Sequence, residues 1–340
     1  MKFNYKEFIS KDIFDSICEI KVNTPEIITS ESISRKRRKN ITKDGKLLLL
    51  ATDHNARMIT DYDGDIVRMG NRYEWLSSIV RILICNEIDG FEGTPDIIED
   101  LLILNYISKK SSGIDFLSNK LMIGTVNRGG LKGTSWEMDD QCTCFTVERI
   151  AYLKLDGVKF MFRIDIDDDR SGKIIKYCSD IVNQSTKKGL PIFIESLYVH
   201  KTRNGYSVDT TTVNLVKVNG VASALGNSAS MKWLEIPFNN NFERVSISTT
   251  CPILALPNGV ARKALDVVQE YDINKSVAKN IRGMLLGTNV LLPMDEDPLC
   301  LASAISKIWH KNLDPKIALA EARKEMKNEK NSLRKYFKEE

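Results

Sequence analysis

The stretch that decides the fold is Asp156-Gly-Val-Lys-Phe-Met-Phe-Arg-Ile-Asp-Ile-Asp-Asp-Asp169. Successive side chains of a β-strand point to opposite faces. One face therefore carries the polar residues Lys159, Arg163 and Asp165, while the other carries four apolar residues. This pattern favours a parallel barrel, in which the apolar face of a strand meets a helix and the inner face ends at a site.

The same rhythm of short apolar runs and helix-like segments recurs from residue 45 onward. We expect strands at Leu47–Asp53, Gly90–Thr94, Leu121–Asn127, Val158–Asp165, Ile192–Ser196, Trp233–Phe238, Ile253–Leu256 and Met284–Gly287. Eight strands with helical crossovers predict an α/β fold, a (β/α)8 TIM barrel. The barrel is expected over 45–312, after a helical extension and basic linker (1–44) and before a charged C-terminal helix (313–340).

Composition narrows the class of protein and its partners. The 340 residues carry 49 basic and 45 acidic side chains, and this net charge of +4 does not by itself imply nucleic acid. The seven cysteines form no CxxC pair, which predicts free thiols in a reducing cytoplasm. No apolar run approaches the roughly 18 residues that cross a bilayer. We therefore expect a cytoplasmic protein without a membrane or nucleic-acid partner.

A basic run, Arg35-Lys-Arg-Arg-Lys39, lies between the extension and the barrel. Its composition indicates a solvated linker. The alternative is a contact with an anionic ligand or with nucleic acid.

Polar residues gather at the predicted strand ends, where barrel enzymes place their chemistry. These residues come from seven of the eight strands and the loops that follow them, and they predict a site for a small-molecule substrate. The expected site residues are Asp53, His54, Arg57, Asn127, Arg128, Lys159, Arg163, Asp165, Glu195, Glu235, Asn258, Gly259, Gly287 and Asn289.

Residues 45–295 resemble a known family, most specifically at the first five strands. The resemblance is carried by Leu47–Arg57, Gly93–Leu102, Ile123–Leu131, Asp156–Asp168 and Pro191–Glu195. These stretches are similar to the aldolase-like (β/α)8 proteins often associated with inositol catabolism, and to class I fructose- and tagatose-bisphosphate aldolases. The resemblance implies a lyase of carbohydrate metabolism, an aldolase that needs no cofactor or metal and assembles as a homo-oligomer.

In such aldolases a lysine amine forms a Schiff base with the substrate carbonyl, and a carboxylate handles the hydroxyl proton. Glu195 and Asp53 match the family's carboxylates on strands five and one, and either would serve as acid or base if burial raises its pKa. A salt bridge from Glu195 to Lys159 or Arg163 remains the alternative. For Asp53 the alternative is a strand-end cap, and His54 is expected to be a packed residue more than a catalyst.

The sixth predicted strand departs from the family. The family places its Schiff-base lysine in a Trp-Leu-Lys-apolar-Pro context, whereas this chain reads Trp233-Leu-Glu-Ile-Pro237. Glu235 thus replaces the amine, and Lys232 lies at an odd offset that should point it toward a helix. Lys159 is the candidate replacement, because alternate strands feed the same inner layers and it should meet Glu235. A neighbouring carboxylate would favour the ammonium form, so covalent chemistry and a binding or structural role both stay open.

The last two strand ends also depart from the family. Related barrels hold phosphate on glycine-rich loops there, but this chain has Pro257-Asn-Gly259 and Gly287-Thr-Asn289. A phosphorylated substrate is therefore in doubt, although Gly259 and Asn289 could bind a polar group. The acidic run Asp165–Asp169 lacks the pattern of a calcium loop and is expected to cap a helix, so no metal site is predicted.

Three functions follow from these patterns. The first is an aldolase-like carbon–carbon lyase acting on a small carbonyl or sugar-like substrate. The second is an isomerase or dehydratase that uses carboxylates alone, with Glu235 in the amine's place. The third is a non-catalytic ligand-binding barrel, with the basic run and the C-terminal helix as its contacts.

Overall fold

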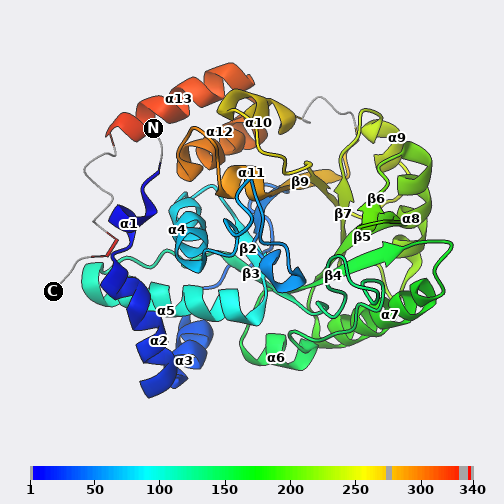
Figure 1. Cartoon of the computed structure of the whole chain (residues 1–340), viewed down its shortest axis with the longest axis horizontal. Helices are drawn as coiled ribbons and strands as arrows, with labels where there is room; N and C mark the ends of the chain where they lie inside the picture. The colour runs from blue at the N-terminus through cyan, green and yellow to red at the C-terminus, as the bar shows by residue number, and fades with distance from the viewer. Residues whose placement is uncertain (1–2, 273–277, 329–335, 338–340) are drawn as a thin grey trace.

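A computed structural model describes residues 3–272, 278–328 and 336–337. Its parallel strands form a closed ring, because β4 pairs with β5 and β1 pairs with β9 (Figure 1). The ring strands are β1 Leu47–Ala51, β2 Gly90–Gly93, β3 Leu121–Thr125, β4 Gly157–Ile164, β5 Ile192–Thr202, β7 Lys232–Pro237, β8 Ile253–Leu256 and β9 Ile281–Leu286. The predicted (β/α)8 barrel is confirmed, with all eight ring strands where the sequence places them.

Helices surround the ring. They are α4 Arg72–Leu83, α5 Pro95–Ser112, α6 Val147–Tyr152, α7 Arg170–Lys188, α8 Thr212–Ala224, α9 Phe242–Ser246, α10 Ala264–Glu270, α11 Thr288–Leu291 and α12 Pro298–Lys311, with a short 3-10 turn, η1, at Asn55–Arg57. The long ones have standard ends: α5 begins with Pro95 in its first turn, and α5 and α7 stop at Gly113 and Gly189, which adopt positive φ.

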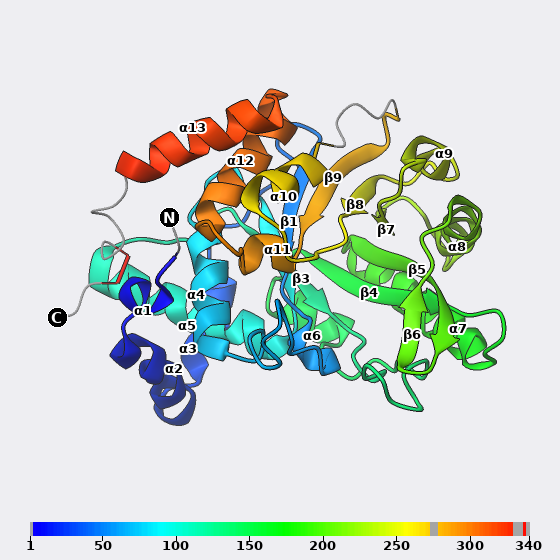
Figure 2. The same ribbon diagram turned by 45° about the horizontal axis from the view of Figure 1, so that its top comes forward.

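Both ends of the chain add helices outside the barrel (Figure 2). The N-terminal extension consists of α1 Tyr5–Phe8, α2 Lys11–Asn23 and α3 Glu26–Ser34, and the last two pack on α5. The C-terminal helix α13 covers Pro315–Asn328, and the buried pair Tyr336–Phe337 is not helical and meets Phe8. The rest of the predicted helix to residue 340 lies outside the described residues. No helix in the described part is long and apolar enough to cross a membrane.

The barrel interior is apolar except at its C-terminal end. Seven buried side chains fill it: Leu47, Leu49, Leu121, Ile123, Phe193, Leu254 and Leu285. A much larger apolar cluster lies between the strands and the helices. Because each ring strand alternates between these two cores, the inner residues near its C-terminal end are raised above the apolar filling and face the site.

One strand, β6 at Gly205–Val208, was not predicted from the sequence. It pairs antiparallel with the second half of β5, which runs on to Thr202 beyond the predicted end at Ser196. This half leaves the ring and needs the hairpin partner for its backbone hydrogen bonds. The hairpin forms one wall of the cavity described below, while His200 on it is exposed.

The basic run Arg35–Lys39 tethers the N-terminal extension to the starts of the strands. Arg35 and Arg37 bind Asp156, and Arg38 binds Asp89 at 2.7 Å. Each carboxylate also accepts a strand N–H: Asp156 from Met122 at 3.0 Å and Asp89 from the start of β1 at 2.9 Å. The expectation of a solvated linker is wrong for Arg35 and Arg38, because both guanidinium groups are buried in ion pairs.

We expect Asp156→Asn to lower the free energy of unfolding by about 3 kcal/mol, because it leaves the fully buried Arg35 guanidinium without its counter-charge. Denaturant unfolding followed by circular dichroism measures this. The matched control is Asp180→Asn, which removes a carboxylate from an exposed pair with Lys176 and should leave the unfolding midpoint unchanged. Equal midpoints for both variants would show that the tether does not stabilise the barrel.

Candidate active site

A single lysine at the floor of the barrel mouth contacts three carboxylates. The Lys159 ammonium lies 2.9 Å from Glu195 and 3.2 Å from Glu235, and it also hydrogen-bonds Glu92. Glu92 and Glu235 are fully buried, Lys159 is 2% exposed and Glu195 is 12% exposed as side chains. We call these four residues the lysine–carboxylate cluster. Its most accessible member is Glu195.

The register of the barrel explains why the four meet. Glu92, Lys159 and Glu235 come from the second, fourth and sixth ring strands (β2, β4 and β7), which feed the same inner layer. Glu195 on β5 lies opposite Glu235 in the β5–β7 ladder. The predicted meeting of Lys159 and Glu235 thus occurs. The sequence analysis did not name Glu92 as a site residue, although the same even-strand argument points to it.

Burial and mutual charge separate the protonation states of the three carboxyl groups. Burial, with the charge of Glu235, raises the pKa of Glu92 well above its usual range, and burial also raises the pKa of Glu235. The stronger rise is at Glu92, so this carboxyl group is the one that most favours the protonated, neutral form. Burial opposes ionisation of Glu195 as well, but Lys159 outweighs it and lowers the pKa of Glu195. The cluster therefore holds an acid and a base side by side.

The same carboxylates decide the state of the lysine. Burial alone would lower the pKa of Lys159, but the charges of Glu195, Glu235 and Glu92 together raise it above the usual lysine value. Lys159 is consequently an ammonium ion at neutral pH and carries no free electron pair for attack on a carbonyl.

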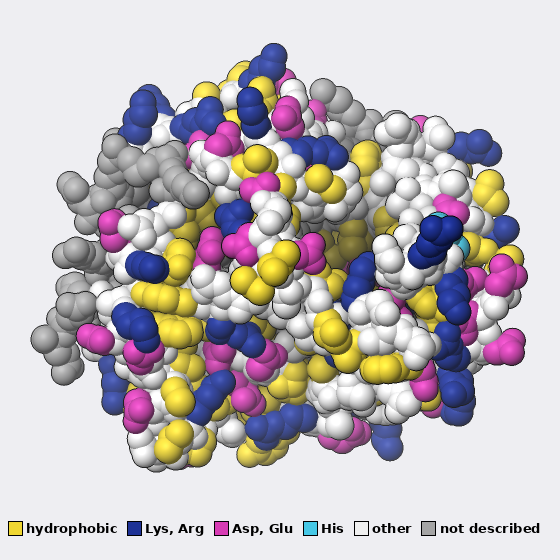
Figure 3. Space-filling model, in the orientation of Figure 1, with side chains coloured by type: hydrophobic (Ala, Val, Ile, Leu, Met, Phe, Trp, Pro, Cys, Tyr) yellow, Lys and Arg dark blue, Asp and Glu magenta, His cyan; other side chains and the backbone are white. Residues whose placement is uncertain are grey.

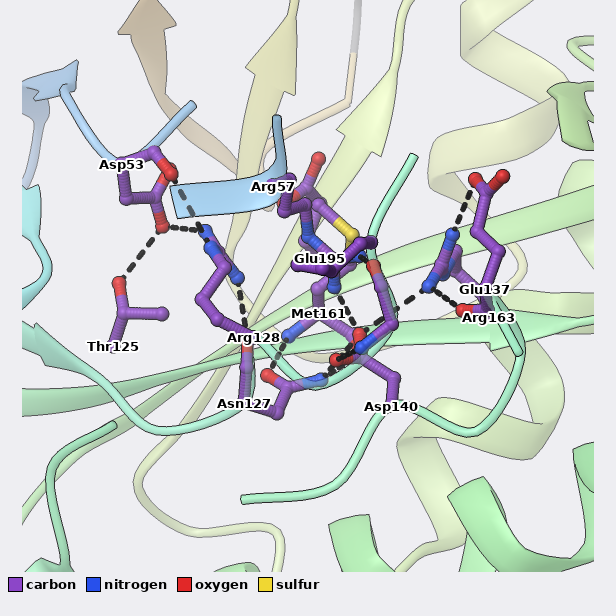
Figure 4. Close-up of polar contacts among 12 residues, drawn as sticks. Asp53, Arg57, Thr125, Asn127, Arg128, Glu137, Asp140, Met161, Arg163 and Glu195 are labelled. Atoms are coloured by element: carbon purple, nitrogen blue, oxygen red, sulfur yellow. Dashed lines mark hydrogen bonds and ion pairs between the residues drawn. The ribbon is translucent and has the colours of Figure 1, made fainter. Parts of the chain in front are cut away.

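The end of β1 contributes a second buried pair. Asp53 forms an ion pair with Arg128 and accepts a hydrogen bond from Thr125 at 2.8 Å (Figure 4). Its neighbour His54 borders the cavity and packs edge-on against Trp75. Burial and the charge of Lys159 lower the pKa of His54 to about 4, so its imidazole is neutral at pH 7. The His54 Nδ1 atom has no hydrogen-bond partner among the described residues.

Two arginines, Arg57 and Arg163, lie next to the cluster (Figure 4). Arg57 and Arg163 both contact the fully buried Asp140, and Arg163 also binds Glu137 at 2.9 Å. Asp140 further accepts the Gly130 N–H at 3.0 Å. Asp140 and Glu137 are both paired with these arginines, so the network of four residues is rigid and close to neutral.

The barrel mouth holds a cavity of about 540 Å³. Figure 3 views the face on which it opens and shows the hollow near the centre. Of the predicted site residues, ten line it: Asp53, His54, Arg57, Arg128, Lys159, Arg163, Glu195, Asn258, Gly259 and Gly287. Glu235 lies directly beneath it, bound to Lys159. The β5–β6 hairpin supplies a further wall through Val199, Tyr206 and Val208.

Three predicted substrate contacts lie elsewhere. The Asn127 side chain links Asp140 to the backbone of Met161. Asp165 accepts backbone N–H groups of Asp167 and Lys201 at 3.0 and 3.2 Å. The Asn289 side chain is buried and accepts the Tyr271 hydroxyl at 3.3 Å. All three hold loops in place around the cavity and do not border it.

Two further sequence predictions concern charged side chains near the site. Lys232 points away from the cavity, as its offset predicted, and donates to three carbonyl groups at the end of α8. In the acidic run, Asp168 binds Arg170 and the Tyr206 hydroxyl. Among the described residues no group of His, Cys, Asp and Glu side chains is arranged to hold a metal ion.

Comparisons with known proteins agree with this architecture. A profile of the Cgl0159-like family matches residues 45–306. The crystal structure of Cgl0159 from Corynebacterium glutamicum is 28% identical, aligns with 90% of this chain and 99% of its own, and has a TM-score of 0.82. No functionally curated protein matches the chain.

More distant structures share the fold alone. A fructose-bisphosphate aldolase from Slackia heliotrinireducens is 12% identical over 96% of each chain, with a TM-score of 0.60. An archaeal fructose-1,6-bisphosphate aldolase, with its catalytic lysine bound to a carbinolamine intermediate, is 17% identical over 83% of this chain and 99% of its own, with a TM-score of 0.55. Because the family profile spans well over half of the chain, this protein belongs to the Cgl0159-like family.

Proposed function

We propose that this protein is an aldolase-like lyase that cleaves or joins a carbon–carbon bond next to a carbonyl group without forming an imine. The observation that carries the proposal is the lysine–carboxylate cluster, in which an ionised Glu195 and a Glu92 carboxyl group of raised pKa both contact a charged lysine. An acid and a base at one end of a barrel cavity are the groups that proton transfer next to a carbonyl requires.

In the cleavage direction each group has one task. Glu195 removes the proton of the substrate hydroxyl, and the bond between the hydroxyl-bearing carbon and its neighbour breaks as the aldehyde forms. The electron pair of that bond moves toward the carbonyl carbon, and the carbonyl oxygen takes the proton of Glu92, which gives an enol. The Lys159 ammonium stabilises the negative charge that develops on this oxygen. The enol hydroxyl then returns its proton to Glu92 while the neighbouring carbon takes the proton held by Glu195, which gives the carbonyl product and restores both carboxyl groups. The condensation direction reverses these steps.

An imine on Lys159 is disfavoured by the same geometry. A Schiff base needs the neutral amine, whereas three carboxylates within ion-pair distance hold Lys159 as an ammonium. Isomerisation or dehydration would use the same acid and base on a carbon-bound proton. We place the lyase reaction first because the chain shares its fold with aldolases. Analysis of products by mass distinguishes the two reactions, because only cleavage yields two fragments.

Glu195→Gln should lower kcat by roughly 10² to 10⁴, because the amide cannot accept the hydroxyl proton. Turnover of aldehyde-forming sugar substrates measures this. Glu148→Gln removes an exposed carboxylate on α6 and is the matched control, expected to keep full activity. Borohydride added during turnover should attach no mass to the protein. Covalent labelling that disappears in Lys159→Met would contradict the proposal.

The pH profile of kcat/KM should be a bell. Activity is lost as pH falls through the lowered pKa of Glu195, which becomes protonated, and is lost as pH rises through the raised pKa of Glu92, which gives up its proton. Glu235→Gln removes a charge that raises the pKa of Glu92, so the alkaline limb should move to lower pH. An alkaline limb that stays in place would show that Glu92 is not the acid.

Lys159→Met separates stability from catalysis. It leaves three buried carboxylates without their cation and should lower the free energy of unfolding by about 3–5 kcal/mol. Adding Glu92→Gln and Glu235→Gln replaces two of the stranded carboxyl groups with neutral amides and should recover most of this loss, measured by denaturant unfolding. Activity should stay absent in the triple variant. Recovered activity would show that Lys159 supplies no stabilisation to the reaction.

A further inference from the structure

At the cavity end formed by β8 and β9, two backbone N–H groups that could bind a phosphate are engaged by side chains. In barrels of this type the loops after the last two strands offer backbone N–H groups to a phosphate. Here the Asn258 N–H donates to the Glu270 carboxylate at 3.0 Å, and the Gly287 N–H donates to the Tyr271 hydroxyl at 3.1 Å. Two donors of these loops are therefore engaged by side chains of the neighbouring helix end.

Charge at this end is unfavourable for an anion. Glu270 places a carboxylate one hydrogen bond from Asn258, which lines the cavity. The nearby cation Arg262 is itself directed to Glu270, at 3.6 Å. A phosphate dianion bound between Asn258 and Gly287 would meet a like charge, which proteins use to reject ligands.

The rest of the cavity leaves little positive charge for a phosphate. Arg57, Arg128, Lys159 and Arg163 are all in ion pairs with carboxylates. Lys132 has no ion pair among the described residues, but it is exposed at the rim. The side walls at the β7–β9 end are apolar: Pro237, Phe238, Leu256, Pro257 and Leu285. Apolar walls with a few polar groups suit a carbon chain that bears hydroxyl groups.

We propose that the substrate is an uncharged polyhydroxylated carbonyl compound, and that Glu270 and Tyr271 exclude phosphate esters from the β8–β9 end of the cavity. This inference rests on the proposed function only in treating the ligand as a substrate. Its test is a binding measurement and does not need turnover. It also distinguishes this chain from the barrels it resembles in shape, which are named for bisphosphate substrates.

The decisive probe is inorganic phosphate, measured by isothermal titration on the full chain. The wild type should bind it at least tenfold more weakly than the double variant Glu270→Gln, Tyr271→Phe, because the variant loses the carboxylate charge and frees the Gly287 N–H. Glu243→Gln, an exposed carboxylate on α9, is the control for a simple change of net charge and should match the wild type. Equal phosphate affinity in the wild type and the double variant would overturn the proposal.

Matched sugars extend the test. Glu195→Gln, which cannot turn over substrate under the proposed function, is titrated with dihydroxyacetone and D-fructose and with their phosphate esters. Wherever either member of a pair binds, the free sugar should bind at least tenfold more tightly than its ester. Tighter binding of an ester than of its free sugar would overturn the proposal. This also holds if the ester binds through Lys132 at the rim. If a free sugar binds but the wild type never cleaves it, the proposed function is wrong, whereas the exclusion of phosphate esters still holds.

Discussion

The electrostatic balance around Lys159 is the constraint on which the site depends. Three carboxylates surround one ammonium in a place that excludes water, where an uncompensated charge is expensive. With a proton on Glu92, whose pKa is raised well above its usual range, the cluster carries a single negative charge instead of two. That proton lowers the cost of burying the cluster, and it also gives the site an acid next to the ionised Glu195.

This arrangement is the opposite of what an imine-forming barrel requires. A Schiff-base enzyme must keep its lysine neutral some of the time, so it keeps carboxylates away or neutral. Here Glu235 occupies the strand position at which the family resemblance predicted a Schiff-base lysine, and the lysine that meets it is Lys159 on β4. The resulting ammonium suits stabilisation of an enolate more than covalent attack.

The surroundings of the cluster are built to hold it still. Below it lies the apolar filling of the barrel. Beside it, Asp140 connects three segments: η1, β4 and the loop that follows β3. On the opposite end of the barrel, Asp89 and Asp156 connect the basic run to the first residues of the strands. Asp140 on one side and Asp89 and Asp156 on the other do the same work: a buried carboxylate joins an arginine to a backbone N–H. Fixed neighbours of this kind keep the acid, the base and the cation within reach of one another.

The sequence by itself determined the barrel, because Val158–Ile164 alternates between two faces and seven further short apolar runs are separated by helix-like segments. It also determined that Lys159 and Glu235 share a layer and that Lys232 does not, since both follow from strand parity. Other features depend on contacts between residues far apart in the chain, which no local pattern records. They include the burial of Arg35 against Asp156 and the hydrogen bonds that keep the Asn127, Asp165 and Asn289 side chains away from the cavity. Only the closed ring brings Glu92 of β2 and Glu235 of β7 into contact with Lys159 of β4, and this proximity sets the protonation of the cluster.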